Sequence, residues 1–323
     1  PGQKSTEAEL VRFSRLGDQF HYLWAARRCL KLLDSRSDLV AISIEGASPN
    51  ETPTGKPIAE GERFIDIAEY FGSELVHEAT QIKYLQLKHS TQSASVPFPP
   101  SKLQKTLKGF ADRFRKFQES KGTENASQIL SFQFITNRPI SSDLLDTVDR
   151  LKKGVPVTDH DTLSKLEKFT GFSKQLLSEF CTHLELLGLQ NNAYLQKSNL
   201  ALDTQAYLPN NDFDAPLRLK ELVTSKALPE NREDPTIRKV DVLRAFQVTL
   251  DRLFPCPPRF EGLDGTIERS QDQLLAQKLE SGSSKFIVHA TSGVGKSITA
   301  QKLALSSSNF RPTVLFDCFG SGD

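Results

Sequence analysis

The chain has 323 residues, of which 37% are hydrophobic and 25% charged, with a formal net charge of +1. This length is enough for about two domains, and the composition is that of a globular protein rather than a disordered or collagen-like one. No apolar run approaches the roughly 20 residues of a membrane span and the N-terminus lacks a secretory signal, so we expect a cytoplasmic protein without a membrane partner.

The first part of the chain predicts an α/β core over about residues 5–140. Apolar residues recur at helical spacing up to Leu33, and Thr6 with Glu9 forms a capping box that starts this helix. Runs rich in β-branched and aromatic residues predict strands over 39–46, 62–71, 80–90 and 128–137, with a helix over 102–120. The order is therefore helix, three strands, helix, strand.

The second part predicts a helical extension and then a new domain. Residues 141–189 show helical periodicity, and 190–236 read as a connection. We expect a first domain over 1–235, a linker over 236–257 that holds a short helix at 237–246, and a second domain over 258–323. The second domain should contain a helix at about 266–280, a strand at 285–290, a helix at 297–306 and a strand at 312–317.

The segment ATSGVGKS at 290–297 has the pattern and context of a phosphate-binding P-loop. Gly293 and Gly295 let backbone N–H groups surround phosphate oxygens, Lys296 reaches the outer phosphates, and the Ser297 hydroxyl binds magnesium. Ala290 replaces the usual first glycine. The alternative is a glycine-rich turn without a ligand. The candidate ATP-binding residues are Ser292, Gly293, Val294, Gly295, Lys296 and Ser297.

Hydrolysis would need an acidic residue on a second strand to polarise magnesium and water. Asp317 ends the predicted strand that follows the P-loop helix, and it is either that acid or an ordinary strand-end aspartate. Because so little sequence follows Ser297, we expect a truncated NTPase domain and a natural protein that continues beyond Asp323.

The predicted sheet carries a candidate metal-dependent nuclease site. Glu45 ends one strand, Asp66 lies on the next, and Gln86 and Lys88 alternate on a third, so they share one face. Glu45, Asp66 and the neutral carbonyl of Gln86 would bind Mg²⁺, and Lys88 would orient water and neutralise charge on a phosphate. The alternative is a solvated sheet face, which is the usual reason for polar residues at alternate strand positions.

The predicted helix at 102–121 has an excess of positive charge. Seven cations against Asp112 and Glu119 give a local net charge of +5, which suits a DNA backbone. A solvated helix face is the alternative. The cations are Lys102, Lys105, Lys108, Arg113, Arg115, Lys116 and Lys121.

These motifs resemble a known family. The GDQFHYLW helix and the strands IEG, FIDIAEYF, YLQLKHS and FITNRP resemble the PD-(D/E)xK endonuclease domain of bacterial antiphage effectors, found in CBASS systems and fused to STAND NTPases of the AVAST type. The later segments KVDVLRAF, LFPCPPRFEG and VHATSGVGKS resemble the linker and NTPase start of the STAND proteins. Gln86 removes one charge from the metal site, and Gln19 matches a polar position of uncertain role on the first helix.

The resemblance implies a restriction-endonuclease-like mixed sheet core with a helical extension, followed by the start of a P-loop (STAND) NTPase domain. It further implies cleavage of double-stranded DNA with Mg²⁺ and ATP as cofactors. A C-terminal sensor, absent from this sequence, would bind a phage protein and drive assembly of a homo-oligomer, a tetramer. The residues alone also allow an inert DNA-binding or interaction module fused to a P-loop NTPase, or a simple P-loop ATPase.

Overall fold

A computed structural model describes residues 7–34, 36–121, 129–208, 212–249, 265–281, 285–291 and 294–308. The chain divides into two compact units, Pro1–Gln247 (unit 1) and Val248–Asp323 (unit 2). No described helix combines the length and apolar character needed to cross a bilayer.

Unit 1 is built on a mixed sheet, which confirms the predicted α/β class. The strands lie in the order β5-β4-β3-β2-β1-β6. β1 pairs antiparallel with β2 and β6, β2 pairs antiparallel with β3, and β4 pairs parallel with β3 and β5. Their bounds are β1 Leu39–Ile44, β2 Ile67–Phe71, β3 Gln81–Lys88, β4 Leu130–Thr136, β5 Leu184–Leu187 and β6 Thr236–Arg238.

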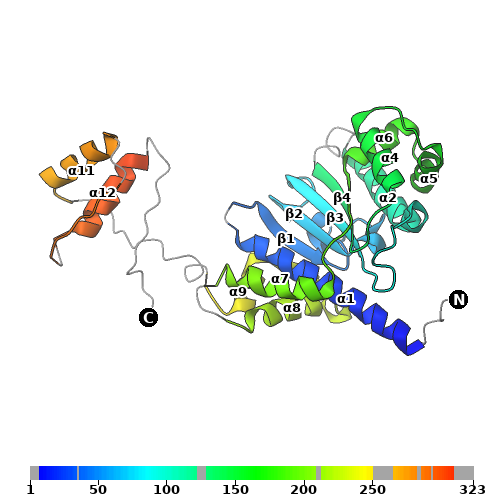
Figure 1. Ribbon diagram of the computed structural model, residues 1–323, viewed down its shortest axis with the longest axis horizontal. Coiled ribbons are helices and arrows are strands. Elements are labelled where there is room, and N and C mark those ends of the chain that lie inside the picture. Colours follow the sequence, from blue (N-terminus) through cyan, green and yellow to red (C-terminus); the bar gives the residue numbers. More distant parts are fainter. Residues whose placement is uncertain are drawn as a thin grey trace. The chain divides into compact units, whose positions relative to one another are not determined.

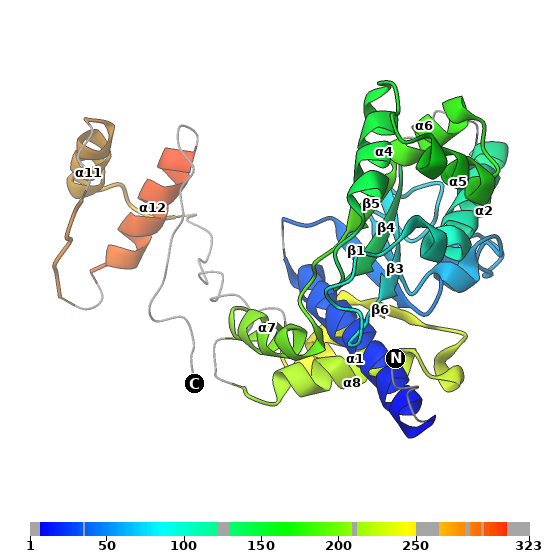
Figure 2. The same cartoon turned by 45° about the vertical axis from the view of Figure 1, so that its right-hand side comes forward.

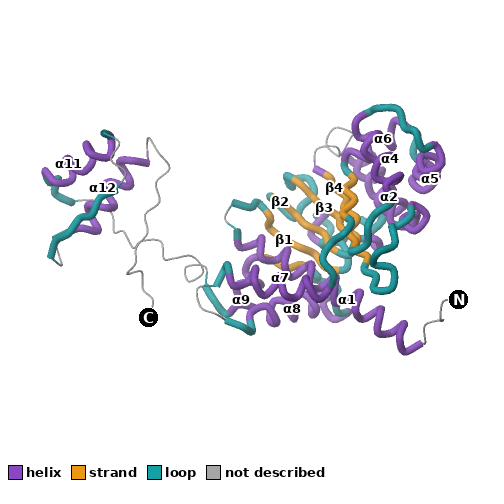
Figure 3. Tube along the Cα trace, in the orientation of Figure 1, coloured by secondary structure: helices purple, strands orange, loops and turns teal. Residues whose placement is uncertain are grey.

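Helices cover both faces of this sheet (Figures 1 and 2). On one face, α1 (Glu7–Cys29) packs against α7 (Ala193–Gln205) and α8 (Ala215–Lys226), and α9 (Lys239–Phe246) packs against α8. On the other face lie α2 (Gln104–Lys121), α4 (Ser142–Lys153), α5 (His160–Thr170) and α6 (Lys174–Thr182). Figure 3 shows the strands in orange between these two groups of helices.

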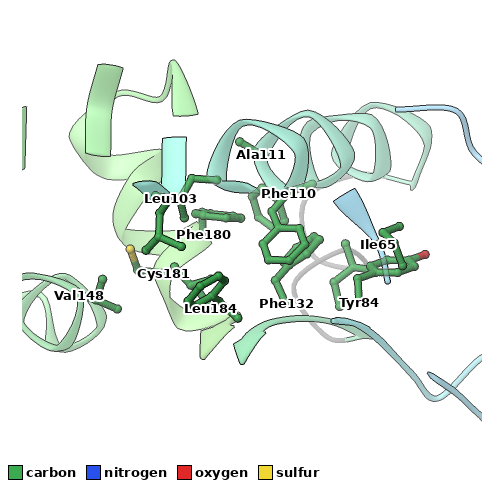
Figure 4. Packing of buried hydrophobic residues seen from close by; sticks show 14 of the residues in the cluster. Ile65, Tyr84, Leu103, Phe110, Ala111, Phe132, Val148, Phe180, Cys181 and Leu184 are labelled. Atoms are coloured by element: carbon green, nitrogen blue, oxygen red, sulfur yellow. The ribbon is translucent and has the colours of Figure 1, made fainter. Parts of the chain in front are cut away.

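The core between the sheet and α2 is rich in aromatic rings. Apolar residues of α2 at helical spacing face β3 and β4, and Figure 4 shows Phe110 over Phe132. The ring centroids of Phe110 and Phe132 lie 5.0 Å apart, and those of Phe132 and Phe180 lie 5.6 Å apart. Burial of each such side chain contributes about 1.5–3 kcal/mol, so this packing fixes α2 on the sheet.

Two glycines let the segment before β2 lie directly against α2. A Cβ atom on Gly109 would come within 2.1 Å of the Phe64 ring, and one on Gly61 within 2.1 Å of the Gly109 carbonyl oxygen. Gly61 also has a φ of 71°, which favours glycine. This close approach fixes the chain two residues before Asp66.

The second half of unit 1 differs from the sequence prediction. Leu184 and Leu187, expected on a helix, form β5 beside β4. The predicted connection at 190–236 contains α7 and α8, and the predicted linker contains β6 and α9, so unit 1 extends to Gln247. The physical reason is pairing: β6 supplies hydrogen bonds to the open edge of β1, which the sequence cannot reveal.

Unit 2 contains two described helices, α11 (Ser270–Glu280) and α12 (Lys296–Ser308), close to the predicted ranges. They are joined by a hydrogen bond of 2.6 Å from Thr299 Oγ1 to Asp272 Oδ1. The strand predicted at 285–290 was wrong, since these residues form no strand and Ile287 is 97% exposed. The neighbouring strand predicted at 312–317, with Asp317, lies outside the described residues. Among the described residues, no strand is present to hydrogen-bond with the backbone of 285–290.

Candidate functional sites

The predicted nuclease residues come together at one end of the sheet of unit 1. Antiparallel pairing places the last residues of β1 and β3 beside the first residue of β2. The Glu45 amide donates to the Asp66 carbonyl over 2.8 Å, and the Asp66 amide donates to the Leu85 carbonyl over 2.9 Å. Lys88 is the last residue of β3 and Gln86 lies two residues before it. The structure therefore gathers all four backbone positions at this end.

Hydrogen bonds from β3 fix the side chain of Asp66. Its Oδ2 atom accepts from Nε2 of Gln86 over 2.8 Å and from the Leu87 amide over 2.6 Å. In the described part of the chain no hydrogen bond reaches its Oδ1 atom, which leaves that oxygen available to a cation. Charge-assisted bonds of this kind hold a carboxylate in one orientation.

The orientation of Gln86 differs from the expected one. Its side chain is buried, and Oε1 accepts from the Thr106 hydroxyl over 3.4 Å while Nε2 faces Asp66. The carbonyl oxygen predicted to bind metal is therefore turned toward α2. The reason is that the carboxylate of Asp66 can only accept, so it attracts the donor end of the amide, while the Thr106 hydroxyl donates to the other end.

Glu45, at the same end of the sheet, has an unusual backbone conformation and a raised pKa. Its φ of 55° lies in the left-handed region, which costs a non-glycine residue about 1–3 kcal/mol. Partial desolvation, followed by the negative charges of Asp66 and Asp18, raises the pKa of Glu45 to about 7, and Lys88 opposes the rise. A bound cation would relieve this repulsion between carboxylates.

The sequence analysis missed three residues of α1 that border the site. Asp18, His21 and Tyr22 follow helical spacing, and His21 Nδ1 lies 4.0 Å from Asp66 Oδ2. Burial lowers the pKa of His21 more than the charge of Asp66 raises it. Gln19, singled out instead, lies about 100° around the helix from Asp18. Polar residues occur all along α1, so no local sequence signal marked these three.

The donors fit Mg²⁺ better than a metal that needs an all-protein cage. Among the described residues, no three or more His, Cys, Asp or Glu side chains are close enough to enclose a metal ion. Mg²⁺ is commonly bound by one or two carboxylates and several waters. Glu45 and Asp66 supply two carboxylates, so the residues present suit that ion.

The cations of α2 are less available to a ligand than predicted. Arg113 is buried and paired with Glu51 at 2.6 Å, and Arg115 pairs with Asp112 at 3.2 Å. Lys116 lies 3.5 Å from Glu60. The side chain of Lys121 lies outside the described residues, so the exposed cations are Lys102, Lys105 and Lys108. The predicted excess of positive charge is therefore available mainly at the N-terminal end of this segment, because Glu51 and Glu60 pair with cations in its middle.

The candidate phosphate loop of unit 2 is described in part, and Ser292 and Gly293 lie outside the described residues. Gly295 has a φ of 82°, Lys296 begins α12, and Val294 and Ser297 flank these two residues. Lys296 Nζ donates to the carbonyls of Ala290 over 2.9 Å and Thr291 over 2.7 Å, so its ammonium group lies against the loop.

Arg269 is a second cation at this loop, and the sequence analysis missed it. Its guanidinium donates to the Val294 carbonyl, and a Cβ atom on Gly295 would lie 2.7 Å from its Nη2. Gly295 is favoured here by its φ, whereas the Arg269 side chain could move aside for a Cβ atom.

No protein-family model matches the sequence, and no curated protein matches it. Among solved structures, the Acinetobacter baumannii Cap4 SAVED/CARF-domain containing receptor is 12% identical, with a TM-score of 0.40 over 70% of this chain and 45% of that chain. The same receptor with the cyclic trinucleotide 2'3'3'-cAAA is also 12% identical, with a TM-score of 0.40 over 78% and 47%. This chain spans less than half the length of these receptors, and similarity at this level assigns no function to it.

Proposed function

We propose that unit 1 is a Mg²⁺-dependent endonuclease that cuts double-stranded DNA and acts in antiphage defence. The observation that carries the proposal is the fixed carboxylate of Asp66, held by Gln86 and Leu87 at the sheet end that also carries Glu45 and Lys88. An acid, an amide and an ammonium on adjoining strands of a mixed sheet fit the restriction-endonuclease-like arrangement.

Each residue has a role that follows from its chemistry. Mg²⁺, when bound, polarises the scissile phosphate and lowers the pKa of its bound water. Asp66 through Oδ1 and Glu45 would hold the ion, and a half-turn of the Gln86 amide would present its Oε1 as well. The Lys88 ammonium would neutralise charge that develops on the phosphate and orient the attacking water.

Unit 2 is proposed to bind ATP and Mg²⁺ as the first part of a STAND switch. Lys296, Ser297 and the turn at Gly295 support this, because the ammonium, the hydroxyl and the start of α12 suit a nucleotide phosphate. By family resemblance, a sensor outside this sequence would bind a phage protein, and assembly into a homo-oligomer would activate the nuclease.

The test combines metal binding with DNA cleavage by the purified chain. Mn²⁺ should raise the Tm of the wild type but not of Asp66→Ala, and Mg²⁺ with supercoiled plasmid should give nicked and linear DNA. Lys88→Ala should cut about 10²–10³ times more slowly. Lys83→Ala is the matched control, because Lys83 lies on the same strand against the Phe71 ring, away from the site.

A second candidate is an inert DNA-binding or interaction module fused to a P-loop NTPase. The burial of the Gln86 carbonyl oxygen against the Thr106 hydroxyl favours it, since that oxygen is not presented to a metal held by Asp66 and Glu45. If no Mn²⁺ binding depends on Asp66, the result would support the inert module and contradict the nuclease proposal.

A further inference from the structure

A cavity of about 500 Å³ lies directly beside Lys88 in unit 1. Its walls come from the ends of β3 and β4, the loop after β3, and the turn that leads into α2. Three lysines, Lys88, Lys102 and Lys105, line it together with the hydroxyl-bearing residues Ser90, Ser101 and Thr136. Within the described part of the chain, no carboxylate lines this cavity.

The walls of the cavity are fixed by hydrogen bonds. The Asn137 side chain accepts from the Ser90 amide over 2.9 Å and donates to the Ser90 carbonyl over 2.8 Å. Arg138 donates to the carbonyls of Val96 and Pro97 over 2.8 and 2.9 Å. A site that is already shaped loses less entropy when a ligand binds.

The lining favours a phosphate backbone over a base. Two aromatic rings lie in the described wall, and neighbours engage both. Phe98 has the Arg138 guanidinium 5.0 Å from its ring centroid and the Phe134 ring at 4.9 Å, and the His89 ring packs against Phe20 with centroids 5.0 Å apart. Lysine ammonium groups and hydroxyls are the groups that contact phosphate oxygens without reading sequence. Because Lys88 also belongs to the candidate nuclease site, a backbone in this cavity would run next to that site.

We propose that this cavity binds the phosphodiester backbone of duplex DNA beside the scissile bond, through Lys102 and Lys105, without base recognition. The proposal rests on the proposed nuclease function and assigns it a DNA-binding subsite. It also locates the useful charge of the 102–121 segment at its N-terminal end, because Arg113, Arg115 and Lys116 are engaged in ion pairs.

The experiment measures binding of the full chain to a fluorescent DNA duplex of random sequence over a range of salt concentrations, with Ca²⁺ in place of Mg²⁺. Lys102→Ala/Lys105→Ala should weaken binding and lower the slope of log affinity against log salt by about 1 to 2, since each lost phosphate contact removes about 0.9. Lys152→Ala/Lys153→Ala, which removes the same charge from α4, should leave both unchanged. Two duplexes of different sequence should bind equally.

Several results would overturn the proposal. An unchanged salt slope in the Lys102/Lys105 variant would do so, as would no duplex binding by the wild type or tighter binding of an RNA duplex through the same lysines. The outcomes also separate the two proposals. Binding that depends on Lys102 and Lys105 without any metal-dependent cleavage would contradict the nuclease proposal but not the DNA-binding subsite. Cleavage that needs Lys88 but has the same KM in Lys102→Ala/Lys105→Ala as in the wild type would contradict the subsite proposal but not the nuclease.

Discussion

Nε2 of Gln86 donates a hydrogen bond of 2.8 Å to Oδ2 of Asp66, so an amide stands where a second carboxylate could stand. This contact neutralises part of the charge of Asp66 without adding a negative charge of its own. Gln86 is buried, which makes any change of its charge costly. The pair therefore offers a direct test of where a metal binds.

We expect Gln86→Glu to make the stability of unit 1 depend on metal. Two carboxylates at this distance repel, so the metal-free variant should lose about 1–3 kcal/mol of unfolding free energy. Mn²⁺ should restore this loss and bind more tightly than to the wild type, because the site gains one negative charge. Thermal unfolding with EDTA and with Mn²⁺ measures both effects.

Gln133→Glu is the matched control for that experiment. Gln133 donates from Nε2 to Oε2 of Glu185 over 2.6 Å, which is the same kind of contact on an exposed strand pair. We expect a smaller loss of stability there and no added Mn²⁺ response. An equal Mn²⁺ response in the two variants would mean that the ion does not bind at Asp66.

A second prediction concerns the buried ion pair of α2. Arg113 donates to both carboxylate oxygens of Glu51 over 2.6 and 2.7 Å, and neither side chain is exposed to solvent. Arg113→Met leaves the buried charge of Glu51 without a cation, although the Tyr70 and Tyr84 hydroxyls still donate to it, so unfolding free energy should fall by about 3–5 kcal/mol in urea titrations. Lys153→Met on α4 breaks an exposed pair with Asp149 and should cost about 1 kcal/mol or less. Similar losses in the two variants would contradict the buried network.

The first half of the fold was accessible from sequence because its signals are local. Runs of β-branched and aromatic residues mark β1 to β4, and alternation alone puts Gln86 and Lys88 on one face of β3. Leu184 and Leu187 have a spacing of three that fits a helix, and only pairing of β5 with Phe132 and Ile135 on β4 makes them a strand. Tertiary pairing thus overrides local periodicity in short segments.

The candidate site was accessible in part for the same reason. Asp66 directly precedes β2 and Gln86 lies on β3, so pairing of these two strands brings them together. His21 reaches the site because of the angle at which α1 crosses the sheet and the rotation of α1 about its own axis. No local sequence pattern specifies either of these. Arg113 was counted as a surface cation because its partner, Glu51, is 62 residues away in sequence. Long-range charge pairing is the kind of contact that composition cannot show.

The third prediction concerns pH and His183. Nδ1 of this residue lies 2.9 Å from the Leu130 carbonyl oxygen, and its buried Nε2 has no hydrogen-bond partner among the described residues. Burial lowers the pKa of His183 below its usual value of about 6.5, so the unfolded chain takes up a proton first as pH falls. Stability should therefore fall as pH drops from about 7 toward the folded pKa, by at most about 1.4 kcal/mol per pH unit for one group.

His183→Gln tests this pH dependence. The variant cannot take up that proton, so its unfolding free energy should change less between pH 7.5 and pH 5.5 than that of the wild type. Urea unfolding at the two pH values gives the comparison. A steeper change in the variant would mean that protonated His183 stabilises the fold, which is opposite to the effect of burial.

The last prediction uses two glycines of unit 1 in different surroundings. Gly109 lies on α2, where a Cβ atom would meet the Phe64 ring at 2.1 Å, whereas one on Gly17 of α1 would meet nothing within 4 Å. Gly109→Ala should lose about 1–3 kcal/mol, because α2 or the segment before Asp66 must move. Gly17→Ala should gain about 0.5–1 kcal/mol of unfolding free energy from helix propensity alone.

Since the displaced segment leads into Asp66, Gly109→Ala should also weaken Mn²⁺ binding, while Gly17→Ala should not. Loss of stability in both variants would show that α1 is not a regular helix at Gly17.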